Sequence, residues 1–171
     1  DDIARYRKQG EESLKVFLKA RIHDFKPTQK TELDFKNQGV VLGNARLKGF
    51  IDVIDADKSQ KTVVVTDYKT GSPLTNWQQP PSAQEYSRIK SHRYRQQLLF
   101  YKLLVDNSAE FGSKGYKTIG GKLVFVEPDY YGKIKELELD YEPLELIRMS
   151  KLVQVVWDKI QKLEFMDTSV Y

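Results

Sequence analysis

Two aspartates and a lysine stand at the ends of two apolar segments and form a candidate hydrolytic site. Asp52 lies in GFIDVID (49–55), and Asp67 and Lys69 lie in KTVVVTDYKTG (61–71). Side chains at i and i+2 of a strand share a face, so Asp67 and Lys69 would face the same side as two of the preceding valines. Burying both ions there is costly unless they pair or bind a metal or substrate. A strand end that has simply left the core is the alternative interpretation.

The two aspartates point to a metal site if their strands are neighbours. In an antiparallel pair, Asp52 and Asp67 would come close to each other, and two half-buried carboxylates repel unless a positive charge lies between them. Mg²⁺ typically takes one or two carboxylates together with waters and phosphate oxygens. Lys69 would then contact a phosphate, or help to orient and deprotonate an attacking water.

The segment RYRQQLLFYKLLV (93–105) predicts a helix that adds polar groups. Gln97 and Tyr101 are spaced i, i+4, so they lie on one face and one turn apart, and Arg93 and Tyr94 precede them on neighbouring faces. Taken singly, Tyr101 fits a core aromatic and Gln97 a surface amide. Their position after the two strands makes them candidates for the same site.

Hydrophobic periodicity and turn signals predict the elements that must position these residues. The first helix ends before Pro27, and residues 31–69 form a three-stranded antiparallel meander with Gly43-Asn44 as a turn candidate. Pro143 suits the first turn of the last helix. The predicted order, in one domain, is a helix (1–22), three strands (31–35, 45–55 and 62–70), a helix (86–105), two strands (120–128 and 134–141) and a helix (143–163).

The composition of the chain limits the classes of protein to which it can belong. The chain has 171 residues, a net charge of +4 and no cysteine, so it holds no disulfide, zinc ribbon or iron–sulfur cluster, which fits a reducing compartment. No apolar run approaches the ~18 residues of a membrane span, and no leader of the signal-peptide type is present. The mild positive charge suits a polyanionic partner. Basic residues interleaved with aromatics in YSRIKSHRYR (86–95), beside Gln97, favour contact with a nucleic-acid strand, and a helix start with a charged outer face is the alternative.

Three motifs in this order resemble the PD-(D/E)XK nuclease superfamily, above all the RecB-like nuclease domains attached to bacterial DNA helicases and helicase-nucleases. GFIDVID is similar to the family's G-hydrophobic-I-D motif, TDYKTG to its D-Y-K-T signature and QLLFY to its Q-L-x-x-Y motif. Each motif alone is weak, but three in the family order are more specific. The resemblance covers about residues 31–165. It implies an α/β fold with a restriction-endonuclease-like core, in which helices flank a central mixed sheet with an antiparallel meander.

The resemblance also implies an activity, which is metal-dependent hydrolysis of DNA phosphodiester bonds in repair or recombination. The implied cofactor is Mg²⁺ or Mn²⁺. The implied partners are DNA and covalently linked helicase domains, with no membrane, and the implied location is the cytoplasm, in association with the nucleoid. The implied site residues are Asp52 and Asp67 as metal ligands and catalytic groups, Lys69 as the catalytic lysine, and Gln97, Tyr101, Arg93 and Arg95 as substrate-binding residues.

The chain also departs from the family pattern. RecB-like domains usually carry a metal-binding histidine on a helix before the first strand, whereas His23 follows a helix end and His92 precedes the glutamine helix. We expect that histidine to lie upstream of Asp1. Residues 1–171 would then be a single RecB-like domain excised from a longer helicase-nuclease, without its first part and with weakened activity. A second hypothesis keeps the fold without the chemistry, as a catalytically incomplete module for DNA binding or protein interaction.

Overall fold

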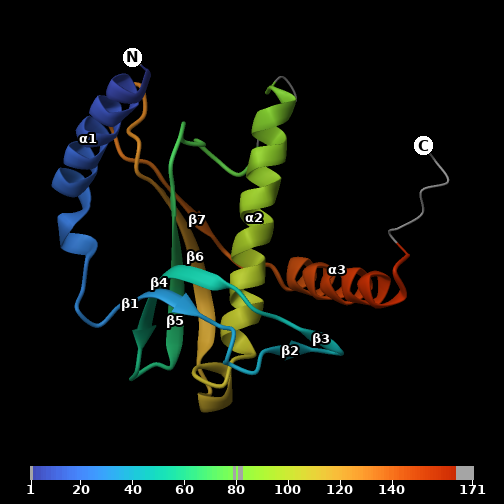
Figure 1. Ribbon diagram of the computed structural model, residues 1–171. Coiled ribbons are helices and arrows are strands. Elements are labelled where there is room, and N and C mark those ends of the chain that lie inside the picture. The colour runs from blue at the N-terminus through green and yellow to red at the C-terminus, as the bar shows by residue number, and fades with distance from the viewer. Residues whose placement is uncertain (1, 79, 81–82, 165–171) are drawn as a thin grey trace.

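A computed structural model describes residues 2–78, 80 and 83–164. Figure 1 shows one sheet with α1 on one side and α2 on the other. This arrangement confirms the predicted α/β class with a central mixed sheet. The elements are α1 (Asp2–Arg21), η1 (Ile22–Asp24), β1 (Lys30–Asp34), β2 (Val41–Leu42), β3 (Ala45–Arg46), β4 (Phe50–Asp57), β5 (Thr62–Lys69), α2 (Glu85–Asp106), η2 (Gly112–Lys114), β6 (Lys117–Phe125), β7 (Glu136–Leu139) and α3 (Pro143–Lys162).

The main sheet has the strand order β1-β4-β5-β6-β7. The first three strands form the predicted antiparallel meander, with Val53 opposite Thr66 between β4 and β5. Strands β5 and β6 are parallel, which requires a long crossover, and α2 lies in that crossover. Strand β7 then returns antiparallel to β6. Because β5 and β6 run in the same direction, Lys69 and Phe125 lie side by side at one end of the sheet.

The predicted strand at 45–55 is wrong in one respect, because the structure divides it. Strands β2 and β3 form a separate hairpin in which Gly43 has a φ of +59°, as a glycine at the first central position of a type II′ turn would. The chain then turns before β4 begins at Phe50. Gly49 lies at this break, and a Cβ there would come 3.0 Å from Leu104 of α2. The close approach of Leu104 favours a residue without a side chain at this position.

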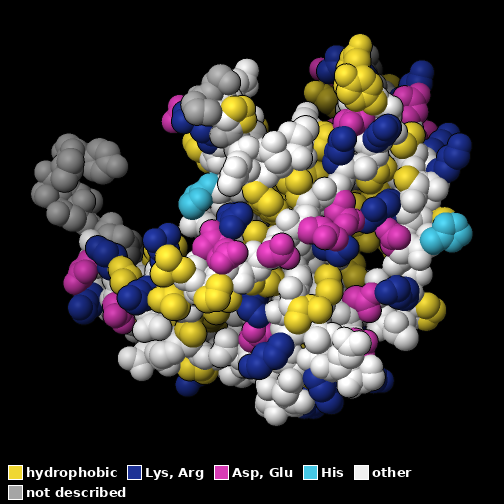
Figure 2. All heavy atoms as spheres, turned by 180° about the vertical axis from the view of Figure 1, so that it is seen from behind, with side chains coloured by type: hydrophobic (Ala, Val, Ile, Leu, Met, Phe, Trp, Pro, Cys, Tyr) yellow, Lys and Arg dark blue, Asp and Glu magenta, His cyan; other side chains and the backbone are white. Residues whose placement is uncertain are grey.

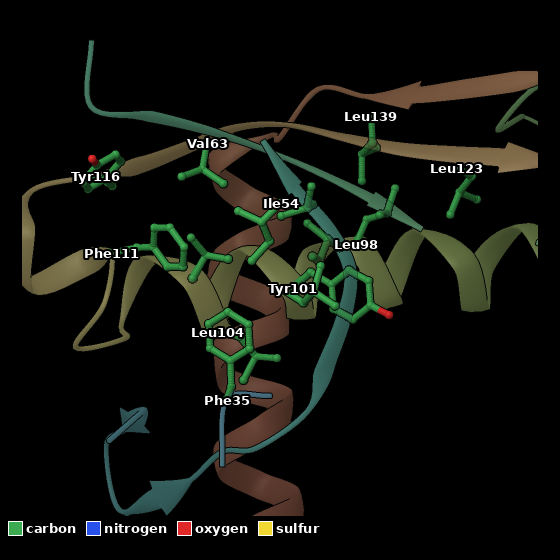
Figure 3. Close-up of a cluster of buried hydrophobic side chains, with 14 of the residues drawn as sticks. Phe35, Ile54, Val63, Leu98, Tyr101, Leu104, Phe111, Tyr116, Leu123 and Leu139 are labelled. Carbon is green, nitrogen blue, oxygen red and sulfur yellow. The ribbon is translucent and has the colours of Figure 1, made fainter. Parts of the chain in front are cut away.

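The hydrophobic core lies between the sheet and α2. Alternate residues of β5 point to this side, and Val63 and Val65 have no exposed surface. Leu98 and Leu104 of α2 are equally buried, and Figure 3 shows Tyr101 between them in the same cluster. Each fully buried aliphatic side chain contributes about 1.5–3 kcal/mol. The polar residues that follow on these faces are therefore held by a rigid support.

The first and last helices contribute less to the core than their apolar patterns predict. In α1 the buried residues are Ser13 and Phe17, and Phe17 packs edge to face on Tyr68 with ring centroids 5.7 Å apart. Helix α3 begins at Pro143, as predicted, but none of its residues is buried. Within the described residues, no helix combines the length and hydrophobicity that crossing a membrane requires.

Candidate active site

The end of β5 carries a buried carboxylate on the side that faces α2. Asp67 is only 2% exposed, and it continues the face that Val63 and Val65 occupy. Lys69 follows on the same face and is half-buried. Its ammonium lies 2.6 Å from Oδ2 of Asp67. The pattern of charges that looked costly in the sequence is therefore a buried ion pair.

Two side chains of α2 hold the other oxygen of Asp67. The hydroxyl of Tyr101 donates a hydrogen bond to Oδ1 at 2.8 Å, and Nε2 of Gln97 donates to the same oxygen at 2.9 Å. Gln97 also donates to the Tyr101 hydroxyl at 2.7 Å. The i, i+4 spacing on the helix thus delivers two donors to one carboxylate oxygen.

The ammonium of Lys69 is fixed from the same helix. Oε1 of Gln97 accepts a hydrogen bond from Lys69 at 2.7 Å, so one amide contacts both members of the ion pair. The ring of Tyr94 lies under the ammonium, with its centroid 4.8 Å from Nζ. This distance is within the range of a cation–π contact. Tyr94, Gln97 and Tyr101 are spaced i, i+3 and i+7, so they share one helix face.

Asp52 of β4 lies beside this group. Its Oδ2 accepts a hydrogen bond from the backbone N–H of Tyr68 at 2.8 Å, and its side chain is half-buried. The antiparallel pairing ends with Val53 and Thr66, and Asp52 and Asp67 are the next residues along the two strands. The charge of Asp52 is close enough to raise the pKa of Asp67. The structure therefore brings Asp52, Asp67 and Lys69 into one place.

The electrostatics reflect this crowding. Burial raises the pKa of Asp67, and the charge of Asp52 adds to the rise, whereas Lys69 and the hydrogen bond from Tyr101 offset part of it. Burial also raises the pKa of Tyr101 well above its usual range, with the charge of Asp67 as the next cause. The phenol therefore stays protonated at neutral pH and remains a donor to the carboxylate.

The residues present fit a divalent cation with oxygen ligands. Oδ2 of Asp67 is buried, and the Lys69 ammonium lies 2.6 Å from it. The charge of Asp52 raises the pKa of Asp67, and a cation between the two carboxylates would relieve this repulsion. The described part of the chain contains no group of three or more His, Cys, Asp or Glu side chains placed for a metal. Two carboxylates still suffice for Mg²⁺, which keeps waters and substrate oxygens.

The remaining residues named from the sequence lie in other surroundings. Arg95 forms a two-pronged ion pair with Glu145 of α3, at 2.8 and 2.7 Å, so it joins two helices. Arg93 is exposed on α2. His92 is exposed on the same helix, and His23 lines a cavity beside the opposite face of the sheet, together with Tyr68.

Two residues near the site were missed by the sequence analysis as site residues. Tyr94 contacts Lys69, and Lys90 lies 5.7 Å from the centroid of the Tyr94 ring. Lys90 also donates to the backbone oxygen of Ser72, in the segment after β5, at 2.7 Å. The spacing of Lys90, Tyr94 and Gln97 at i, i+4 and i+7 was the available signal, because it places all three on one face.

This geometry can be compared with known proteins. The family model of the PD-(D/E)XK nuclease superfamily matches residues 2–169. The chain belongs to this superfamily. The segment Asp67-Tyr68-Lys69 has an acidic residue, one intervening residue and a lysine, which is the spacing that the (D/E)XK part of the superfamily's name describes.

No curated protein matches the chain. Among solved structures, the chain is similar to the crystal structure of SSO0001, with 18% sequence identity and a TM-score of 0.39. The similarity covers 84% of this chain and 55% of that one, so the chain spans about half the length of this relative.

Proposed function

We propose that this PD-(D/E)XK domain hydrolyses phosphodiester bonds of DNA with Mg²⁺ or Mn²⁺. The observation that carries the proposal is the buried carboxylate of Asp67, which pairs with the Lys69 ammonium at 2.6 Å and lies near the charge of Asp52. A purely structural ion pair would not need a second carboxylate, whose charge opposes ionisation of the first. The ammonium beside it is the cation that a phosphate would meet next.

Each side chain has a distinct part in this proposal. Asp52 and Asp67 would hold the cation, which when bound activates water and stabilises negative charge on the phosphate. Lys69 would bind a phosphate oxygen or orient the attacking water, since its ammonium lies at the edge of the buried group. Gln97 and Tyr101 would position Asp67 and Lys69, because they touch both members of the pair.

The wider biological setting is part of the same proposal. The RecB-like motifs support attachment to helicase domains and a role in DNA repair or recombination. The positive net charge of +4 supports a polyanionic partner such as DNA. A cytoplasmic, nucleoid-associated location follows from that partner. These points go beyond the superfamily and depend on the longer protein.

Cleavage of labelled DNA by Lys69→Ala tests the proposal. The full-length wild-type protein should cut with Mg²⁺ or Mn²⁺ and not with chelator, and residues 1–171 alone should cut more weakly. Lys69→Ala should cut at least about 10²–10³-fold more slowly, as expected when one preorganised stabilising group is lost. Lys58→Ala is a matched control, because Lys58 is exposed in the turn before β5, at the other end of that strand.

The outcomes separate the two hypotheses. Cutting that persists in chelator, or at the wild-type rate in Lys69→Ala, would place the chemistry elsewhere. DNA binding without cutting by the full-length protein, under either cation, would favour the catalytically incomplete module. Loss of cutting in the Lys58→Ala control would show that the assay reports general charge and not the site.

A further inference from the structure

The connection between β6 and β7 carries two adjacent tyrosines that the described protein leaves uncovered. Tyr130 is 96% exposed and Tyr131 is 81% exposed. Their rings touch each other edge to face, with centroids 5.5 Å apart. An aromatic side chain buries about 150–250 Å² when it packs, so two neighbouring rings in water forgo a large hydrophobic gain. Such an exposed aromatic pair is typical of a binding contact.

The turn beneath the two rings is firmly built. Oδ1 of Asp129 accepts hydrogen bonds from the backbone N–H groups of Tyr131 and Lys133, each at 2.9 Å. Oδ2 of Asp129 pairs with Lys135 at 3.1 Å. These contacts, the backbone N–H of Lys133 first among them, lower the pKa of Asp129. A preorganised turn displays both rings without the ordering cost that a floppy loop would incur on binding.

This turn leaves the sheet directly beside the candidate active site. Phe125 at the end of β6 pairs with Lys69, and the next N–H, of Val126, donates to the Lys69 oxygen at 2.9 Å. The carboxylate of Glu127 accepts a hydrogen bond from the N–H of Gly71 at 2.8 Å. From Val126 to Tyr130 an extended chain spans at most about 14 Å. The rings therefore lie within a few nucleotides of a phosphate bound at Lys69.

The shape of the molecule leaves room for a nucleic-acid strand between the two tyrosine rings and Lys69. Figure 1 shows the β6–β7 connection rising next to the first half of α1, with the start of α2 on the other side of the molecule. Figure 2 shows a hollow between two raised parts in the same upper region, seen from behind. The residues of the connection nearest the sheet, Val126 and Glu127, line a cavity with Tyr6, Ser13 and Thr70.

We propose that Tyr130 and Tyr131 stack on unpaired bases of a single-stranded nucleic acid whose backbone crosses the site at Lys69. This inference rests on the proposed nuclease function and names the form of its substrate. Base faces are hidden inside a duplex and open in a single strand, so exposed rings on a rigid turn favour the single strand. Every base has an aromatic face, so the contact tolerates any sequence. The exposed Lys133 supplies positive charge for a neighbouring phosphate.

Binding measured without cutting tests this inference. In chelator, the affinity of the full chain is measured by fluorescence anisotropy for a labelled single strand, for the same strand without bases, and for a duplex. The double variant Tyr130→Ala/Tyr131→Ala should bind the single strand about 5- to 150-fold more weakly for each base that stacks. It should bind the abasic strand and the duplex as the wild type does. The double variant with phenylalanine at both positions should keep wild-type affinity, because the rings remain.

Ile119→Ala is the control variant. It removes an exposed apolar side chain near the opposite end of β6 and should leave the affinity for every ligand unchanged. Equal affinity of wild type and the double alanine variant for the single strand would overturn the inference, and so would an equal loss on the abasic strand. Ring-dependent binding to anionic vesicles, with unchanged affinity for the single strand, would overturn it as well. Ring-dependent binding by a protein that never cuts DNA would support the contact and refute the hydrolytic function.

Discussion

Tyr101→Phe is the most informative single change, because it removes one oxygen and keeps the ring in the core. The lost hydroxyl donates to Oδ1 of Asp67 at 2.8 Å and accepts from Gln97 at 2.7 Å. A hydrogen bond to a charged group is worth about 1.5–3 kcal/mol. At about 2–4 °C per kcal/mol for a chain of this size, the melting temperature should fall by about 3–12 °C.

The same variant should change how the site titrates. The hydrogen bond from Tyr101 lowers the pKa of Asp67, so its loss should raise that pKa further. Any step that needs the Asp67 carboxylate will then lose activity at a higher pH, and the acid limb of the cleavage profile should move upward. The stability loss should also be smaller at low pH, where a protonated Asp67 makes a weaker, neutral hydrogen bond.

Thermal unfolding, urea unfolding at several pH values and a pH–rate profile check these results. Tyr116→Phe is the control, since Tyr116 is a buried tyrosine whose ring packs on Phe111, with centroids 5.8 Å apart, near the start of β6. A loss in Tyr101→Phe no larger than in this control would contradict the energetic argument. An acid limb that stays in place while cutting continues would show that Asp67 is not the group that titrates.

Two further variants separate chemistry from support. Asp67→Asn should abolish cutting without lowering stability at neutral pH. Burial raises the pKa of Asp67, so the wild type loses stability as the pH rises from the usual carboxyl range through the raised pKa, whereas asparagine does not titrate. Urea unfolding at low and neutral pH should therefore show that the variant gains stability relative to the wild type as the pH rises. Arg95→Ala should lower stability by up to about 1 kcal/mol and leave the cutting rate within about twofold of the wild type, because Arg95 forms a partly exposed ion pair with Glu145 of α3. Urea unfolding measures the stability, and a cleavage assay measures the rate.

Much of the fold could be predicted because local patterns and tertiary packing agree. The valines of β5 and the proline at the start of α3 each predicted an element that the structure contains. The break before β4 was not predicted, and local patterns do not report the contact there between Gly49 and Leu104, which are far apart in the sequence. The weak packing of α3 could not be predicted either, because the spacing of its apolar residues does not determine which other element covers them.

The proximity of Asp67, Lys69, Gln97 and Tyr101 was predictable, but their individual contacts were not. Period-2 alternation placed Asp67 and Lys69 on one face, and helical spacing placed Gln97 with Tyr101. Neither pattern states that a single amide touches both ions, as the contacts of Gln97 do. The position of Arg95 beside the glutamine helix motif suggested contact with DNA, whereas its side chain pairs with Glu145.

The site and the core depend on the same helix, and this dependence explains how a buried carboxylate is tolerated. Desolvation of Asp67 is offset by three groups, and two of them, Gln97 and Tyr101, come from α2. Their neighbours Leu98 and Leu104 fix that helix against the sheet through fully buried contacts. Because α2 connects two parallel strands and packs on the sheet, its position is fixed independently of the hydrogen bonds that it donates to Asp67. The free energy of packing thus holds the two donors at one oxygen of Asp67, and the other oxygen pairs with the Lys69 ammonium.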